Sequence, residues 1–218
     1  FVLATKATTA ANAIFLQSTA PLYVMLLAPL FLRERLRPLD FAVAAMFLAG
    51  LCAIVLGQDP VQSSAPRPSL GNALGAAAGA TFALTLLGLR WLGRSSEPRV
   101  DAGATAVNAG NVFTVLICLP FVVSEPTDVQ PRDIAVALYL GVFQVAAPYA
   151  LLTRGLRYVP AFAAALLVLV EPALNPLWSW LVHGERLGVS SVVGGALILA
   201  ASVAKSAVDR RHVAPRLG

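Results

Sequence analysis

Residues 161–187 read AFAAALLVLVEPALNPLWSWLVHGERL, and residues 10–36 read AANAIFLQSTAPLYVMLLAPLFLRERL. When the second segment is moved forward by 151 positions, Pro21 falls on Pro172 and the two ERL endings coincide without a gap. Each segment is long enough to cross a bilayer, which takes roughly 20 apolar residues. A match at one fixed offset is typical of internal duplication, so the sequence predicts two related repeats.

The composition predicts a protein that crosses a membrane several times. Of the 218 residues, 58% are hydrophobic and only 12% are charged, and the mean hydropathy is +0.76. A soluble domain carries charge on about a quarter of its residues. The net charge of +5 does not indicate nucleic-acid binding, because the arginines lie in short loops between apolar segments. The sequence has no glycine-rich phosphate loop and no metal-like cysteine and histidine spacing, so we expect no cofactor and no metal.

Seven apolar segments predict transmembrane helices, and the expected fold class is an all-α polytopic membrane bundle. The two matched segments are the first and the sixth of these, so five crossings separate them. Because five is odd, the two repeats cross the membrane in opposite directions, as in many secondary transporters. The predicted spans are 11–32, 38–57, 70–93, 102–123, 133–156, 160–182 and 189–208.

The duplication also predicts how the chain is divided. The second repeat begins near Ser69, and the matching position 151 residues earlier lies before Phe1. We therefore expect about three further helices before Phe1, in a ten-helix fold of five plus five. The expected parts are the C-terminal portion of a first repeat (1–57), a linker (58–69), a second repeat (70–208) and a tail (209–218).

The basic residues predict the orientation of the chain. Twelve of the 16 lysines and arginines fall on one side of the membrane in the seven-span arrangement. Cytoplasmic loops carry such an excess, so we expect a cytoplasmic C-terminus and a place in the cell membrane, a bacterial inner membrane. The twelve are Arg33, Arg35, Arg37, Arg90, Arg94, Arg99, Arg154, Arg157, Lys205, Arg210, Arg211 and Arg216.

Glu171 is the first candidate for a functional site, because a carboxylate in the middle of a span is costly unless it faces the interior of the bundle. Asn175 and Trp178 follow it at i+4 and i+7, so the three side chains share one helix face. We expect this face to line a central cavity, where the acid contacts solute, takes up protons or gates the path. An acid that is buried and paired for structural reasons alone is the alternative.

Prolines inside the predicted spans give a second group of candidates. Each proline removes the hydrogen bond to the carbonyl four residues earlier, and the freed carbonyl needs a protein donor or water. Pro21 frees the carbonyl of Gln17, and Pro148 frees that of Gln144. The resulting kinks either gate a cavity or only shape the bundle. The gating candidates are Pro21, Pro148, Pro172 and Pro176, and the further cavity-lining candidates are Gln17, Gln144, Tyr149, Asn108 and Asn111.

Two patterns in the third predicted span are interpreted as structural. Gly71, Gly75 and Gly79 recur at every fourth position, and a face of such small residues lets a neighbouring helix pack closely. Thr81 and Thr85 are expected to donate to carbonyls of their own helix rather than to a ligand.

Three motifs carry a family resemblance. They are APL…LRERL in residues 20–36, GVFQVAAPYALLTRGLRYVPA in residues 141–161 and EPALNPLW…HGERL in residues 171–187. These motifs resemble the EamA-type transporters of the drug/metabolite transporter superfamily. The resemblance implies ten helices with cytoplasmic ends around a central cavity, through which metabolites or amino-acid-like solutes move, often outward. It also implies that the seven spans correspond to helices four to ten.

We therefore predict a secondary transporter that exports small metabolites or amino-acid-like solutes by alternating access between its repeats. A membrane-embedded enzyme is one alternative, but Glu171 and Glu185 are 14 residues apart, about 21 Å along a helix, and cannot form a catalytic pair. A scaffold or sensor without transport is the other alternative, and it gives no reason for a mid-span acid. The expected partners are a small-molecule solute and the lipid bilayer, with protons as the candidate coupling ion and no nucleic acid.

Overall fold

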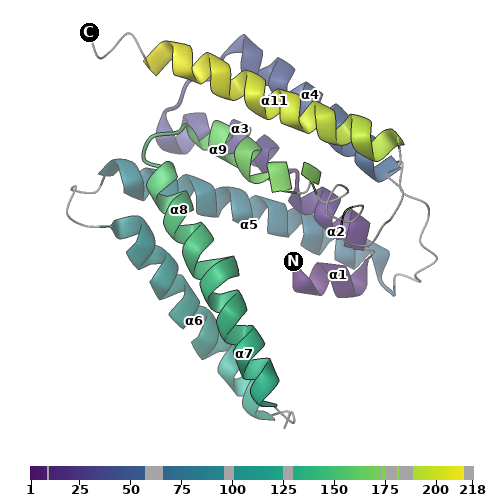
Figure 1. Cartoon of the computed structure of the whole chain (residues 1–218), viewed down its shortest axis with the longest axis vertical. Coiled ribbons are helices and arrows are strands. Elements are labelled where there is room, and N and C mark those ends of the chain that lie inside the picture. The colour runs from purple at the N-terminus through teal and green to yellow at the C-terminus, as the bar shows by residue number, and fades with distance from the viewer. Residues whose placement is uncertain are drawn as a thin grey trace. The chain divides into compact units, whose positions relative to one another are not determined.

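The computed structural model describes residues 1–8, 10–56, 66–95, 101–124, 130–171, 173–174, 181 and 189–213. These residues are almost entirely helical, and none of them forms a β-strand (Figure 1). The elements are α1 (Val2–Ala7), α2 (Ala10–Gln17), α3 (Ala20–Leu32), α4 (Pro38–Leu56), α5 (Pro68–Ser95), α6 (Ala102–Ser124), α7 (Pro131–Leu140), the π-helix η1 (Gly141–Ala146), α8 (Ala147–Gly155), α9 (Ala161–Val168) and α11 (Val189–Val213).

Five helical segments in the described ranges are long and apolar enough to cross a membrane. They lie close to the predicted spans, because the prolines and charged residues that bound each apolar run also end its helix. This confirms the prediction of a multi-pass helical membrane fold, although the predicted span 160–182 falls partly outside the described residues. The segments are Asn12–Leu32, Pro68–Arg94, Ala102–Pro120, Pro131–Gly155 and Val192–Asp209, and Pro38–Ile54 is a shorter apolar helix.

The chain forms two compact units. The first consists of Phe1–Leu87 together with Pro160–Gly218, and the second is Gly88–Val159. The first unit thus joins helices from both predicted repeats, whereas the second unit lies wholly within the predicted second repeat.

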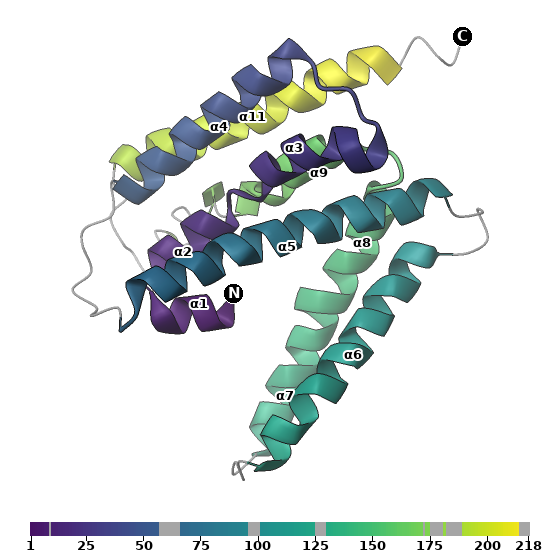
Figure 2. The same cartoon turned by 180° about the vertical axis from the view of Figure 1, so that it is seen from behind.

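In the first unit α4 and α11 run antiparallel and side by side (Figure 2). Their backbones approach closely because glycines meet: an ideal Cβ built on Gly50 would lie 2.7 Å from the carbonyl oxygen of Gly194. A second pair is formed by α3 and α9, and the first six residues of α9 are all buried. The hydroxyl of Ser202 on α11 donates to the carbonyl of Leu166 on α9, at 3.1 Å, and so connects the two pairs.

The glycine face of α5 allows close packing, as the sequence predicts, and the structure shows that the neighbours are α1, α2 and the residues between them. An ideal Cβ on Gly71 would lie 2.5 Å from the backbone nitrogen of Thr8. A Cβ on Gly75 would lie 3.1 Å from Cβ of Leu16, and a Cβ on Gly79 would lie 2.8 Å from the carbonyl oxygen of Leu16. A side chain at Gly71 or Gly79 would meet backbone atoms, and one at Gly75 would meet the Leu16 side chain, so small residues allow α5 to pack here.

The two threonines of α5 also behave as predicted. Thr81 donates to the carbonyl oxygen of Ala77 at 2.9 Å, and Thr85 donates to that of Thr81 at 3.0 Å. Both hydroxyls are therefore satisfied by carbonyls of their own helix.

The first predicted span is interrupted where Pro21 predicts a break. Helix α2 ends at Gln17, and α3 begins at Ala20, with the buried Pro21 in its first turn. At the break the Thr19 hydroxyl donates to the carbonyl oxygen of Leu16 at 2.6 Å. A proline is well accommodated in a first helical turn, because its missing N–H would be unpaired there in any case. A gating role for this break stays a prediction.

Candidate functional site

A pocket of about 200 Å³ lies within the second unit, between α6 and the irregular helix formed by α7, η1 and α8. Helix α6 contributes positions i, i+3, i+4 and i+7, which form one face. The opposite wall comes from η1 and the first turns of α8. The lining residues are Ala104, Val107, Asn108, Asn111, Gly141, Val145, Ala146, Tyr149 and Ala150.

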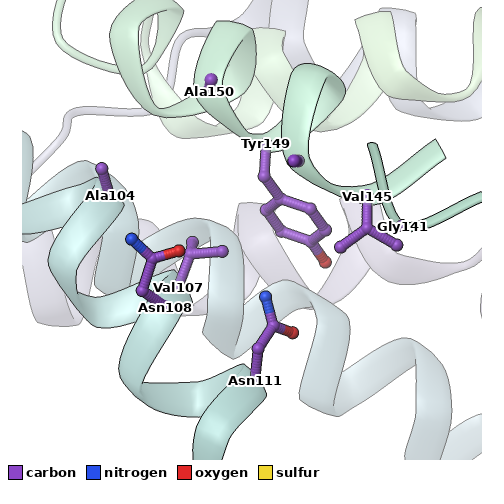
Figure 3. A pocket seen from close by; sticks show the side chains of 9 residues that line it. Ala104, Val107, Asn108, Asn111, Gly141, Val145, Tyr149 and Ala150 are labelled. Carbon is purple, nitrogen blue, oxygen red and sulfur yellow. The ribbon is translucent and has the colours of Figure 1, made fainter. Parts of the chain in front are cut away.

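Three of the predicted cavity-lining side chains meet in this pocket. Asn108 and Asn111 extend from α6, and the ring of Tyr149 faces them from α8 (Figure 3). None of the three forms a hydrogen bond with another described residue. Two amides and one phenol therefore offer both donors and acceptors to a molecule in the pocket, and no lining residue carries a formal charge. That they bind a solute stays a prediction.

The wall opposite α6 is shaped by a π-helical segment, which the sequence did not predict. The backbone N–H of Ala147 bonds to the carbonyl of Val142, five residues earlier, and Pro148 follows immediately. Pro148 has no N–H to give to Gln144, so the α-helical pattern cannot continue through this point. A π-turn inserts one extra residue and is often found at functional sites. Here it places Gly141 and Val145 on the pocket wall.

The remaining candidates lie elsewhere. Gln144 belongs to η1 but is exposed and does not line the pocket. Gln17 is half-buried at the end of α2, and Glu171 is exposed after the end of α9, both in the first unit. Asn175, Trp178, Pro172 and Pro176 lie outside the described residues, so the expected stripe with Glu171 stays a prediction.

Asp101 positions the start of α6, a role that the sequence analysis missed. Its Oδ1 accepts the backbone N–H of Ala104 at 3.1 Å, which caps the helix, and lies 3.0 Å from Nη2 of Arg157. The Ala104 hydrogen bond, and then the charge of Arg157, hold the pKa of Asp101 below its ordinary value, against the effect of desolvation. An Asp directly before an apolar run was the available signal, because it is a preferred N-cap.

In the same unit, Arg90 binds the C-terminal end of α8, the helix that carries Tyr149. Its Nη1 donates to the carbonyl oxygens of Leu156 and Arg157, at 2.6 and 2.8 Å, just beyond the end of α8. A cation at a helix C-terminus satisfies unpaired carbonyls and interacts favourably with the helix dipole. The sequence indicated Arg90 and Arg157 only as orientation signals. In the structure Arg90 joins α5 to the end of α8, and Arg157 joins the end of α8 to the start of α6 through Asp101.

These features define a class of protein: a multi-pass helical membrane protein with a pocket that offers three uncharged polar side chains beside a broken helix. Broken helices line the substrate sites of many membrane transporters. The family follows from the sequence. The EamA-like transporter family matches residues 1–56 and 69–205, and the chain belongs to this family.

Two curated relatives illustrate the similarity. "Uncharacterized transporter YwfM" of Bacillus subtilis (strain 168) is 30% identical over 135 residues, which cover 62% of this chain and 45% of the relative. The "Threonine/homoserine exporter RhtA" of Escherichia coli (strain K12) is 27% identical over 207 residues, which cover 92% of this chain and 63% of the exporter. The chain therefore spans less than two thirds of the length of either relative.

A solved crystal structure shares the fold. It superposes with a TM-score of 0.77 at 20% identity and covers 95% of this chain and 71% of the other. At this identity the likeness describes the arrangement of helices alone.

Proposed function

We propose that the protein is a secondary transporter that exports small metabolites or amino-acid-like solutes by alternating access between two inverted repeats. Membership of the EamA-like family supports transport, and the two separate stretches that match the family support two repeats. The name of the relative RhtA, a threonine/homoserine exporter, supports an amino-acid-like solute and an outward direction.

The pocket of the second unit is the observation that carries the proposal. Its volume of about 200 Å³ is smaller than the roughly 300–1,000 Å³ of sites for drug-sized ligands, which favours a small metabolite. Asn108, Asn111 and Tyr149 supply hydrogen bonds without a formal charge. Such groups suit the polar, uncharged part of a solute, for example a hydroxyl or an amide.

Transport by vesicles that carry purified protein tests the proposal, with radiolabelled threonine as the first solute. Asn111→Leu keeps the approximate size of the side chain but removes its hydrogen bonds, and we expect transport to fall by about tenfold. Thr114→Val is the matched control, because Thr114 lies on the same helix and its hydroxyl bonds to the carbonyl of Gly110 at 2.9 Å. Equal transport by Asn111→Leu and Thr114→Val, across a panel of small polar solutes, would remove the pocket from the transport path.

The proposed orientation places the C-terminus in the cytoplasm and the protein in the cell membrane. The twelve-to-four distribution of basic residues supports it. Single cysteines that replace Arg67 or Arg94, in a variant without Cys52 and Cys118, report on the two sides of the membrane. We expect an impermeant maleimide added to intact cells to label Arg67→Cys and not Arg94→Cys; the opposite result would reverse the orientation.

A further inference from the structure

Lys205 is a buried cation in the first unit, and it lies between two carboxylates. Its side chain on α11 is only 6% exposed, and its Nζ lies 2.7 Å from Oδ1 of Asp40 on α4 and 3.0 Å from Oδ1 of Asp209. The ammonium also lies 5.8 Å from the centre of the Phe162 ring on α9. A lysine this deeply buried requires opposite charge, and Asp40, which is only 4% exposed, supplies it.

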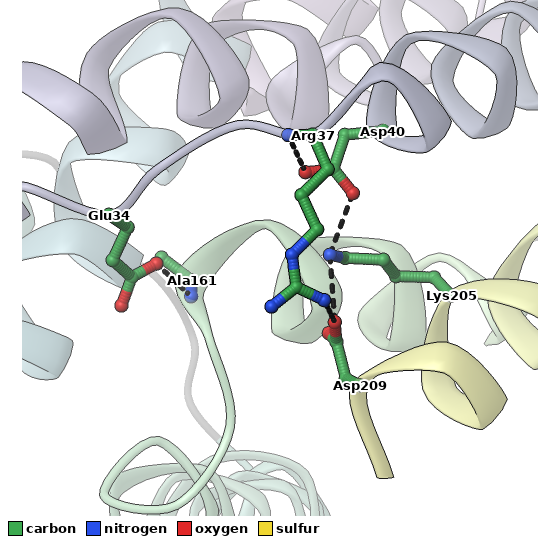
Figure 4. A network of polar contacts seen from close by, with 6 residues as sticks. All are labelled: Glu34, Arg37, Asp40, Ala161, Lys205 and Asp209. Carbon is green, nitrogen blue, oxygen red and sulfur yellow. Dashed lines mark hydrogen bonds and ion pairs between the residues drawn. The ribbon is translucent and has the colours of Figure 1, made fainter. Parts of the chain in front are cut away.

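Arg37 completes a cluster of four charges that is neutral as a whole. Its Nη1 lies 3.9 Å from Oδ1 of Asp209, and its backbone N–H donates to Oδ2 of Asp40 at 2.9 Å (Figure 4). We refer to Arg37, Asp40, Lys205 and Asp209 as the ion cluster. It joins the start of α4 to the C-terminal half of α11, which belong to different predicted repeats.

A further contact between the repeats lies beside the ion cluster. Arg33 adopts a left-handed backbone, with φ at 54°, and turns the chain at the end of α3. Glu34 then accepts the backbone N–H of Ala161, the first residue of α9, at 3.0 Å (Figure 4). The connection between α3 and α4 is therefore bound to both α9 and α11 at the same end of the helix pairs.

At the opposite end of the α4 and α11 pair, the positions equivalent to Asp40 and Lys205 do not carry opposite charges. The repeat offset of 151 residues takes Asp40 to Ser191 and Lys205 to Ile54. If the repeats were exactly symmetric, Ile54 and Ser191 would form the matching contact where α4 ends and α11 begins. A serine and an isoleucine cannot form an ion pair, so the contact between Asp40 and Lys205 has no charged counterpart at these two equivalent positions.

The ion cluster is paired but not fully satisfied. Nη1 of Arg37 and Oδ2 of Asp209 are buried and form no hydrogen bond with the described residues. Oδ1 of Asp40 is bound by the ammonium of Lys205, 2.7 Å away. A buried ion network whose atoms are incompletely bonded gains little over its hydrated state, because desolvation nearly balances the Coulomb attraction. Arg37 is already 42% exposed, so water can enter from its side. The cluster is thus suited to repeated opening rather than to permanent closure.

We infer that the ion cluster is a reversible lock between the repeats, with Lys205 as its central positioning residue. While it is closed, it holds shut the side of the bundle that carries the α3–α4 connection; opening toward that side separates Lys205 from Asp40 and hydrates both. Because the equivalent positions Ile54 and Ser191 cannot form the same ion pair, the lock favours the state that is closed on this side. The inference rests on the proposed alternating access for its role in transport, but not for the lock itself.

Accessibility of single cysteines in vesicles tests the lock. Ala161→Cys reports the locked side, because Ala161 is completely buried and bonded to Glu34. Ser190→Cys reports the other side, since it lies 15 residues before Lys205, about 22 Å along α11. In the Lys205→Met variant we expect an impermeant maleimide to label Ala161→Cys at least about tenfold faster and Ser190→Cys more slowly.

Two further variants separate the lock from loss of folding. Asp40→Lys combined with Lys205→Asp restores the pair and is expected to return labelling toward the original rate. Arg37→Gln removes the most exposed member and is expected to raise labelling about two- to threefold. Asp133→Asn, which removes an acid at the start of α7 in the other unit, is the matched control and should change nothing.

The outcomes are distinguishable. The lock is overturned if Ala161→Cys is labelled at an unchanged rate in both Lys205→Met and Arg37→Gln. It is also overturned if the variant that combines Asp40→Lys with Lys205→Asp is folded but is still labelled rapidly. Faster labelling of Ala161→Cys without slower labelling of Ser190→Cys keeps the lock but contradicts alternating access, and therefore the proposed function.

Discussion

Gly50 and Gly194 face each other where α4 and α11 are closest, and neither position has room for a side chain. An ideal Cβ on Gly50 would lie 2.7 Å from the carbonyl oxygen of Gly194 and 3.0 Å from Cγ1 of Ile198. A Cβ on Gly194 would meet the carbonyl oxygen of Gly50 and lie 2.6 Å from Cγ1 of Ile54. Backbone atoms cannot yield as a flexible side chain can, so the two helices would have to separate.

We therefore predict that Gly194→Ala lowers the thermal stability of the protein in detergent. Overpacking of this kind costs about 1–3 kcal/mol. Gly88→Ala is the matched control, because nothing lies within 4 Å of a Cβ at this position of α5, and the change should be neutral or stabilising. If both variants unfold at the same temperature, the close approach of α4 and α11 is wrong.

The fold could be predicted largely from the sequence because its determinants are local. Apolar runs of membrane length are bounded by Pro38 and by arginines, and the helices follow these bounds: α3 ends directly before Arg33, α4 begins at Pro38 and α5 ends directly after Arg94. The close packing at Gly71, Gly75 and Gly79 could also be predicted, because a repeat of small residues along a helix has few other uses.

The interactions between distant segments could not be predicted in the same way. Asp40 and Lys205 are 165 positions apart, and only the packing of α4 on α11 brings them together. The sequence therefore showed Lys205 as an orientation signal and did not indicate its burial. For the candidate site, helix periodicity placed Asn108 and Asn111 close to one face, but nothing local indicated that Tyr149 would face them across a pocket.

Pro148 is predicted to maintain the π-helix that forms one wall of the pocket. Pro148→Ala supplies the missing N–H four residues after Gln144, so we expect the segment to relax to an α-helix. Loss of one residue from the turn rotates the preceding part of the helix by about 100°, which takes Gly141 away from the pocket. Transport should fall by about tenfold or more while thermal stability is kept or raised, since an internal proline costs a helix about 3 kcal/mol.

Pro120→Ala provides the comparison for this prediction, because Pro120 lies inside α6 but does not line the pocket. Transport assays on both variants, with unfolding temperatures measured in parallel, decide the matter. Full transport by Pro148→Ala would show that the π-helix is not needed.

Asp101 is predicted to make the stability of the second unit depend on pH. Its pKa in the folded protein is lowered, first by the N–H of Ala104 and also by Arg157. Because the folded pKa lies below the unfolded one, the carboxylate stabilises fully above its ordinary pKa of about 4, and the contribution is lost as pH falls through the folded pKa. Asp101→Ala should cost about 1 kcal/mol at pH 7, the usual value of an N-cap, and less at pH 3.

Thermal unfolding of the two proteins at pH 7 and pH 3 measures this difference. Asp101→Asn separates the cap from the charge, because asparagine caps a helix equally well but cannot pair with Arg157. An Asp101→Ala variant that is equally destabilised at both pH values would mean that the ionised carboxylate does not contribute.

Glu171 is predicted to be required for transport and for its coupling to protons. A charged side chain at the centre of a bilayer costs at least about 2.5–3.5 kcal/mol. We therefore expect an acid in mid-span to have a function that a neutral glutamine could not perform. The repeat offset of 151 residues places the buried Ala20 at the equivalent position, so the acid is confined to one repeat. We expect Glu171→Gln to leave folded protein in the membrane but to reduce export driven by a proton gradient by about tenfold or more.

The control for this prediction is Asp133→Asn, which removes a carboxylate outside the pocket and the ion cluster. If protons are coupled through Glu171, export by the original protein changes with the pH on the two sides of the vesicle, whereas the residual export by Glu171→Gln does not. If Glu171 is instead paired for structural reasons alone, the Glu171→Gln variant would be less stable but would export at the normal rate with the original pH dependence. That second pattern would leave the uncharged pocket of Asn108, Asn111 and Tyr149 as the place where the solute is recognised, without a titrating group.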